Sequence, residues 1–215
     1  METPDDRYDE TEEEKRREEE DAPVKIYRKY GRDIMNFISG DRNQPIWSYT
    51  FRLTYEQTDG LLRHAWQNEM DNPFINDLKT FMNPNYTGRI YGGYTLLQLE
   101  LPRQKTKLKI YSKGTLHFLS ALNPNKVLTG ATEFDNNFVV IARPKSIIKN
   151  IYRELDFLMD NDFGRSLSLI TDYEDAITLR FYLQIRINKL LTEEKDIEKL
   201  LKHTLVLVKK LNSLG

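Results

Sequence analysis

The chain has 215 residues, 39% of them hydrophobic, which is enough to form the core of one ordinary domain. It contains no cysteine, which excludes disulfides, thiolate catalysis and cysteine-rich zinc sites and favours a reducing, cytoplasmic location. Its charge is uneven: residues 1–21 hold 12 acidic and 4 basic residues, a net charge of -8. Because the whole chain has a net charge of -1, the remaining residues carry +7.

The N-terminal part of the chain divides into two predicted regions. Residues 1–22 contain few apolar residues and predict a disordered acidic tail, because burial there cannot offset the entropy of ordering. Residues 23–83 predict a short helical region before the main domain, which we call the helical lead-in. Apolar residues recur there at helical spacing, except in one segment that predicts a strand. The expected elements are helices over residues 24–40, 55–70 and 74–82 and a strand over 46–53.

Residues 84–215 predict an α+β domain with a mostly antiparallel sheet and two packed helices on one face. The expected strands cover residues 95–102, 107–112, 113–121, 137–142, 166–172 and 175–188, and the expected helices 144–159 and 192–211. In the closing helix, four apolar residues follow one another from Leu205 to Val208. This stripe is wider than packing on a sheet requires, so a homodimer through this helix is one hypothesis.

The segment "LTGATEFDNNFVVIARPK", residues 128–145, contains two carboxylates, Glu133 and Asp135. In an extended segment, residues two apart lie on one face, as paired catalytic or metal-binding carboxylates must. A structural role for Asp135 is the favoured interpretation, because an Asp beside a turn commonly accepts hydrogen bonds from backbone amides. The residues expected to shape this motif are Thr129, Gly130, Glu133, Phe134, Asp135, Phe138 and Pro144, with Pro144 in the first turn of a helix.

The same residues, with Val140, carry a resemblance to a prokaryotic domain family of unknown function. In that family a Gly-Arg turn leads into a strand, a "TG..EFD..F.V" segment leads into a helix, and a strand with an amphipathic helix closes the domain. The similarity covers about residues 86–211. Members often follow transmembrane segments, whereas this chain has an acidic segment and predicted soluble helices before the domain. The resemblance implies the fold but no catalytic residue.

The stretch "RQKTKLKIYSK", residues 103–113, predicts a strand with a ladder of cations on one face. The cations expected to bind an anion or a partner are Arg89, Arg103, Lys105, Lys107, Lys109 and Lys113. Nucleic acid, anionic lipid or the chain's own acidic tail would complement them, the tail by masking the basic face. The alternative is an exposed edge strand whose lysines prevent unwanted pairing. No aromatic side chain is expected between the cations on this face.

The sequence therefore favours a non-catalytic binding or adaptor domain that engages a protein partner or an anionic surface. A nucleic-acid-binding protein that uses the basic strand and an enzyme with a pocket assembled around Glu133, Asp135 and Arg89 are the alternatives. No catalytic, phosphate-binding or metal-binding motif is present, and the three histidines are scattered, so no cofactor or metal is expected. With no apolar run long enough to cross a bilayer, the protein is expected to be cytoplasmic or peripheral to a membrane.

Overall fold

A computed structural model describes residues 22–38, 47–67, 92–102, 106–113, 120, 123–163, 167–174 and 180–214. The predicted acidic tail up to residue 21, the predicted helix over 74–82 and most of the predicted strand over 113–121 lie outside the described residues. The described helices are α2 (Ala22–Tyr30), α4 (Thr132–Asn137), α5 (Ile147–Leu155) and α6 (Glu194–Leu214), and the short 3-10 helices are η2 (Asp156–Met159) and η3 (Asn161–Phe163).

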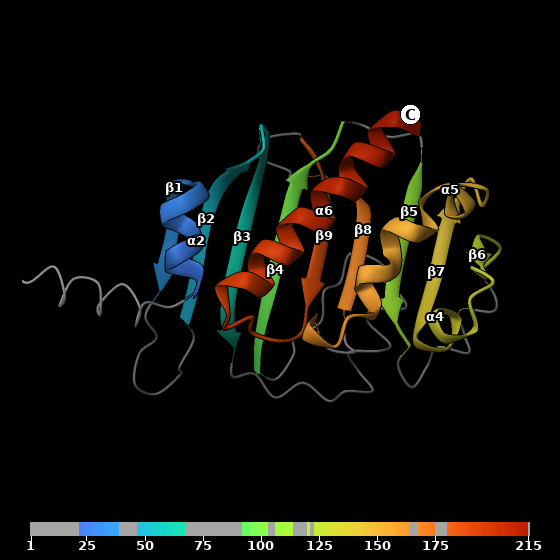
Figure 1. The fold of residues 1–215 in the computed structure, drawn as a ribbon, viewed down its shortest axis with the longest axis horizontal. Coiled ribbons are helices and arrows are strands. Elements are labelled where there is room, and N and C mark those ends of the chain that lie inside the picture. Colours follow the sequence, from blue (N-terminus) through green and yellow to red (C-terminus); the bar gives the residue numbers. More distant parts are fainter. Residues whose placement is uncertain are drawn as a thin grey trace, which may run out of the picture.

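Nine strands form one sheet in which every pairing is antiparallel. The strands are β1 (Gly31–Ile38), β2 (Trp47–Tyr55), β3 (Thr58–Gln67), β4 (Gly92–Glu100), β5 (Lys107–Ser112), β6 (Lys126–Val127), β7 (Phe138–Arg143), β8 (Leu167–Glu174) and β9 (Phe181–Ile187). They lie in the order β1-β2-β3-β4-β9-β8-β5-β7-β6 (Figure 1). The predicted α+β class with an antiparallel sheet is confirmed.

Helices α2, α6 and α5 cover one face of this sheet, which we call the helix side (Figure 1). Most sheet residues on that side are apolar. Eight neighbouring strands each contribute one apolar residue to a continuous row. The members of this helix-side row, in register order, are Phe51, Leu62, Leu97, Ile185, Leu169, Ile110, Val140 and Val127. Seven of the eight are almost completely buried and Val127 packs against them, so this row forms the centre of the core.

Helix α6 lies between the other two helices and contacts both α2 and α5. Its residues Leu205, Leu207 and Val208 are buried, and only Val206 of that apolar run is exposed. Contacts with two helices as well as the sheet explain the width of the stripe within a single chain, and the homodimer stays a prediction. At the α2 contact, Lys29 Nζ and Tyr30 Oη both donate to Glu198 Oε1, at 2.9 and 3.0 Å.

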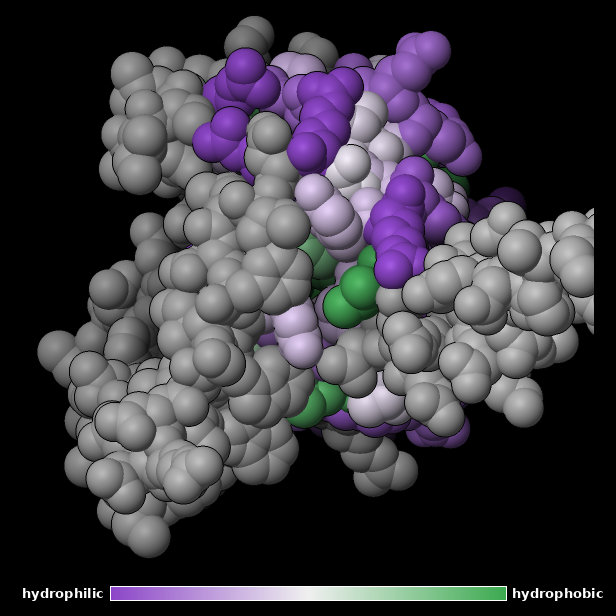
Figure 2. Space-filling model, turned by 90° about the vertical axis from the view of Figure 1, so that its left-hand side faces the viewer, coloured by the Kyte–Doolittle hydropathy of each residue, from purple (hydrophilic) through white to green (hydrophobic). Residues whose placement is uncertain are grey.

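The side of the molecule that carries α2 and β1 is mostly hydrophilic where residues are described (Figure 2). The hydrophobic residues that show on that side are few and separated, as is normal for a protein surface.

The predicted helical lead-in is wrong for two of its segments. Residues 31–38 and 58–67 form the strands β1 and β3, and β3 pairs with β4 of the predicted C-terminal domain. The helix that begins at Ala22 ends at Tyr30, ten residues before the end of the helix predicted over residues 24–40. A Cβ on Gly31 would lie 2.5 Å from the carbonyl oxygen of Tyr27, so the chain can turn here only with glycine.

Candidate functional site

The side of the sheet opposite the helices carries polar residues in register with the core. Moving one residue along each of the eight strands leads from the helix-side row to a second row, which we call the opposite row. Its members are Arg52, Leu61, Gln98, Gln184, Ile170, Lys109, Ile141 and Lys126. This row contains three cations, two glutamines and no acidic residue, so its net charge is positive.

The middle of the opposite side is buried and internally paired. Gln98 Nε2 donates to Gln184 Oε1 at 2.8 Å, and both side chains are at most 6% exposed. Next to them, the guanidinium of Arg186 lies 4.2 Å from the ring centroid of Tyr94, and Arg186 is 5% exposed. The hydrogen bond between the two glutamines and the contact of the Arg186 cation with the Tyr94 ring both offset part of the cost of burying these polar groups. The accessible part of this side is therefore found toward the ends of the row.

Four cations gather at one end of the opposite side, on the neighbouring strands β5, β7 and β6. We call Lys107, Lys109, Lys126 and Arg143 the basic patch. Lys107 is paired directly with Arg143, and Ile141 lies between Lys109 and Lys126. Side chains paired across antiparallel strands have Cβ atoms about 5 Å apart, so like charges at these positions repel one another. None of these three strands contains Asp or Glu, whereas β8, which pairs with β5 on its other side, contains Asp172 and Glu174.

The half-buried Lys109 shows what this arrangement does to an amine. Desolvation lowers the pKa of Lys109 to about 8, and its Nζ lies 5.7 Å from the ring centroid of Tyr111. Burial of an ammonium disfavours its charged form unless an opposite charge lies close by. Among the described residues, no carboxylate raises this pKa again. An anion bound at the patch would supply the missing charge.

The structure corrects two expectations about the basic strand. Strand β5 pairs with β7 on one side and with β8 on the other, so its lysines do not protect an exposed edge. Tyr111 lies on the same side as Lys109, two residues along the strand, although no aromatic residue was expected there. Lys113 follows the end of β5, where its backbone N–H donates to the carbonyl of Asn137 at 2.8 Å. The predicted cations Arg89, Arg103 and Lys105 lie outside the described residues.

Asp135 fixes the turn before α4. Its Oδ1 accepts hydrogen bonds from the backbone N–H and the hydroxyl of Thr129, at 2.8 and 2.9 Å. Its Oδ2 accepts from the N–H of Gly130 at 3.1 Å, and Gly130 has a φ of 89°, a left-handed conformation that favours glycine. The three hydrogen bonds that this carboxylate accepts all hold the turn in place.

The expected extended geometry around Glu133 and Asp135 is wrong. Residues Thr132–Asn137 form helix α4, and residues two apart on a helix point in different directions. The buried Phe134 instead fixes α4 to the core, with its ring 4.9 Å from that of Phe138 and 6.0 Å from that of Tyr152. Pro144 ends β7, but α5 begins three residues later at Ile147, so Pro144 does not stand in the helix itself. Glu133 and Asp135 therefore do not form a pair.

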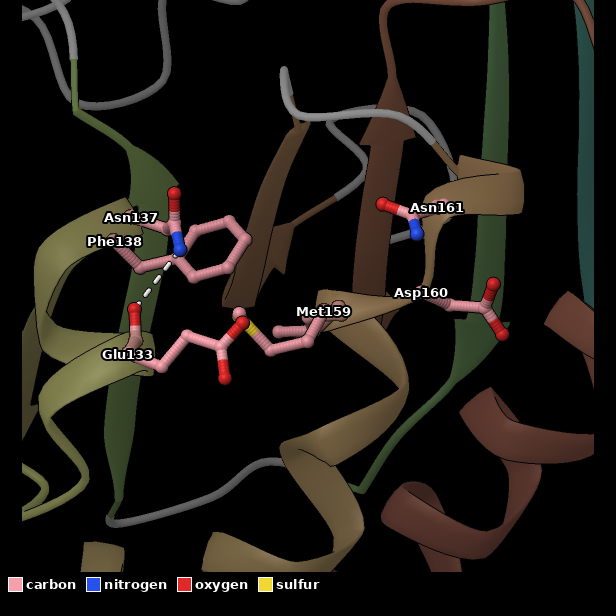
Figure 3. A pocket seen from close by; sticks show the side chains of 7 residues that line it. Glu133, Asn137, Phe138, Met159, Asp160 and Asn161 are labelled. Atoms are coloured by element: carbon pink, nitrogen blue, oxygen red, sulfur yellow. Dashed lines mark hydrogen bonds between the residues drawn. The ribbon is translucent and has the colours of Figure 1, made fainter.

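Glu133 lines a cavity of about 140 Å³ between α4 and the 3-10 helices η2 and η3, which we call the α4 cavity (Figure 3). Phe138, Leu158 and Met159 provide its apolar surface, and Asn137 and Asn161 add amide groups. The side chain of Asp160 points away from the cavity, and its carboxylate is paired with Lys199. Sequence reasoning singled out Glu133 and Phe138, but it gave no reason to connect them with residues 158–161.

The described histidines give no metal site. His64 is buried on β3, and His203 on α6 stacks on Phe157 with ring centroids 5.2 Å apart. The described residues contain no group of three or more histidine or acidic side chains placed to hold a metal ion. Among the described helices, none has the length and the apolar character needed to cross a membrane.

Comparison with known proteins adds no relative: no family model matches the chain, and no curated protein sequence or solved structure matches it. The resemblance to a prokaryotic domain family therefore stays a prediction. Any functional conclusion depends on the geometry of the opposite side and of the α4 cavity.

Proposed function

We propose that this protein is a non-catalytic binding domain that engages an anionic partner through the basic patch. The observation that carries this proposal is the gathering of Lys107, Lys109, Lys126 and Arg143 on three neighbouring strands at one end of the opposite side. Placing like charges next to one another reduces the stability of the sheet unless something compensates. A partner with several negative charges provides that compensation when it binds.

Phosphate groups suit this surface best. Lysine and arginine are the residues that proteins use against phosphates, and neutralising several phosphates at once also releases bound counterions. Lys107 lies about 5 Å from Arg143 across the strands and about 7 Å from Lys109 along its own strand, measured between Cβ atoms. These separations are close to the distance between successive phosphates along an extended nucleic-acid strand, and they also allow contact with neighbouring lipid headgroups.

Binding of a single-stranded nucleic acid is favoured over lipid by one further contact. Tyr111 lies beside Lys109 on the same side of the sheet and is half-buried, which leaves part of its ring available. In proteins that bind single-stranded nucleic acid, bases stack on aromatic side chains while cations follow the phosphates. A lipid headgroup has no flat ring to stack there.

The test is to neutralise three cations of the patch together, as Lys107→Gln, Lys109→Gln and Arg143→Gln. Binding is measured against a single-stranded oligonucleotide and against vesicles containing phosphatidylserine, each at low and moderate salt. We expect the affinity of the wild type for the oligonucleotide to fall steeply with salt. The triple variant should lose at least about tenfold in affinity. The slope of its log affinity against log salt concentration should be smaller by about two to three.

A matched control changes the same charge on the other side of the sheet. Lys149, Lys195 and Lys202 are exposed on α5 and α6, and their replacement by glutamine alters the net charge equally. If this control loses as much affinity as the patch variant, binding depends only on net charge and the proposal fails. Vesicle binding without oligonucleotide binding would assign the patch to a membrane surface and remove the stacking role of Tyr111.

The acidic segment of residues 1–21 is a candidate competitor for the patch, because it has a net charge of -8. Its removal is then expected to raise oligonucleotide affinity at low salt, and to do so only while the patch cations are present. An equal gain in the triple variant would show that the segment repels nucleic acid in general and does not mask the patch.

A further inference from the structure

A second site with the opposite charge lies on the helix side of the sheet. The α4 cavity is formed by α4 and by the chain that follows α5, while the basic patch lies on the opposite side. We propose that the α4 cavity binds a guanidinium group, the arginine side chain of a protein partner, with Glu133 as its counter-ion. This site is independent of the proposed anion binding and would give the domain a second partner.

The Glu133 carboxylate faces the cavity and is open to a ligand. Its side chain extends from α4 toward Met159 across the cavity (Figure 3). Among the described residues, it has no ion pair and no hydrogen bond to its carboxylate; only its backbone carbonyl accepts a bond, from Asn137 Nδ2 at 2.9 Å. Asp135 and Asp160 nearby are both occupied, by the Thr129-Gly130 turn and by Lys199. Glu133 is thus the carboxylate that a ligand can reach.

Carboxylates near Tyr152 make the electrostatic potential beside the α4 cavity negative. The pKa of Tyr152 is raised, first by burial of its hydroxyl and then by the carboxylates of Asp156, Asp135 and Glu133. Three carboxylates that act on one hydroxyl indicate a negative potential beside the cavity. The potential there therefore favours a cation over an anion.

The lining of the α4 cavity combines apolar and polar groups, which suits a guanidinium. Buried Phe138 and Leu158, with Met159, offer apolar and polarisable surface, while Asn137 and Asn161 add amide groups to the lining. A guanidinium combines a flat, weakly hydrated face with five N–H donors in a fixed fork, so it can lie on such a surface and still donate to several oxygens. An ammonium is more strongly hydrated and gains less from the apolar surface.

The volume of the α4 cavity limits how many atoms of a ligand can enter it. A cavity of about 150 Å³ holds a benzene molecule, which has six heavy atoms. The α4 cavity of about 140 Å³ therefore has room for about six heavy atoms. An arginine side chain has six beyond its Cβ, and free arginine has twice that number. The end of a side chain presented by a larger molecule fits this volume, which points to a protein partner rather than to a small metabolite.

The experiment uses the full-length protein labelled with ¹⁵N and titrates it with Nα-acetyl-arginine methylamide. We expect saturable shifts of the backbone amides in residues 133–138 and 158–161. Nα-acetyl-citrulline methylamide, which has the same shape without the charge, should produce no saturable shifts there. Glu133→Gln should weaken the arginine compound roughly fivefold, because an exposed charged hydrogen bond contributes modestly.

Glu193→Gln is the matched control, since Glu193 is an exposed carboxylate at the start of α6 and away from the cavity. This variant should bind the arginine compound as the wild type does. Equal binding of the citrulline compound, shifts confined to other parts of the protein, or wild-type affinity in Glu133→Gln would each overturn the proposal. Because Glu133 is exposed on α4, the glutamine variant should keep the wild-type spectrum elsewhere, so a loss of binding would not reflect unfolding.

Discussion

The two sides of the sheet differ in charge although their residues are neighbours in the chain. On the helix side, eight strands contribute eight apolar residues, and the residue next to each of them belongs to the opposite row with its three cations and two glutamines. Three helices close the first side. The alternation of side chains along a strand thus places the apolar core on one side of the sheet and the basic patch on the other.

The largest expected change in stability comes from replacing Phe51 on the helix side, compared with its chain neighbour Arg52 on the opposite side. Phe51 is 1% exposed on the helix side, with its ring 5.3 Å from that of Tyr27, whereas Arg52 is exposed on the opposite side. Phe51→Ala should lower the free energy of unfolding by about 3–5 kcal/mol, because it leaves a cavity in the core. Arg52→Ala should change it by less than about 0.5 kcal/mol.

Urea unfolding followed by circular dichroism would measure both variants, with unchanged slopes expected against denaturant concentration. Similar losses for the two variants would contradict the division, since they would place Arg52 in a packed environment as well.

A smaller effect is expected in the middle of the opposite row, where polar side chains are buried. Gln98→Leu removes the donor of the 2.8 Å bond to Gln184 and leaves a buried carbonyl oxygen without that partner. The free energy of unfolding should fall by about 2 kcal/mol. The double variant Gln98→Leu/Gln184→Leu should recover most of this loss, because two apolar side chains leave no unpaired group.

A double-mutant cycle from thermal or urea unfolding gives the coupling between the two glutamines. If the double variant loses the sum of the two single losses, the glutamines act separately and the middle of the opposite row is not a paired polar layer.

Burial on both sides also explains where sequence reasoning about the fold failed. In β9, the alternation of Leu183, Ile185 and Ile187 was enough to predict a strand. In β3, Leu61 and Leu62 are neighbours that lie on opposite sides of the sheet, and Ala65 is buried too. Apolar residues at one- and four-residue steps imitate a helical face, so β3 was predicted as a helix.

The turn between β2 and β3 gave no warning of this error. Glu56 and Gln57 form it with φ values of 43° and 67°, a conformation that most two-residue hairpins reach with Asn-Gly or Asp-Gly. The hairpin therefore lacks the signature by which it could have been recognised.

The sequence could predict only those parts of the candidate sites that lie within a single strand. The alternation in β5 placed Lys107 and Lys109 on one side, but the addition of Arg143 and Lys126 depends on the register of β7 and β6. The α4 cavity likewise combines Glu133 with Met159, which lies 26 positions later and is brought close by the packing of α5. No local spacing rule connects such residues, because the contact is made by the tertiary structure.

The smallest expected effect concerns Lys109 and has the opposite sign to the others. Because burial lowers its pKa to about 8, the folded protein holds this proton less tightly than the unfolded chain does. At pH 7 the charged amine therefore destabilises the fold. Lys109→Met should raise the free energy of unfolding by about 1 kcal/mol, a figure reduced from the full shift because the amine keeps some contact with water. Lys149→Met, at an exposed lysine of α5, should have no such effect.

The pH dependence distinguishes this cause from simple packing of the methionine. Below pH 8 Lys109 is protonated in both states and the penalty is complete. From about pH 8 to pH 10 the folded protein releases the proton while the unfolded chain retains it, so the stability of the wild type rises relative to the variant. The advantage of Lys109→Met should therefore shrink over that range. An advantage that is constant with pH would show that Lys109 is adequately solvated, and it would weaken the argument that the basic patch requires an anionic partner.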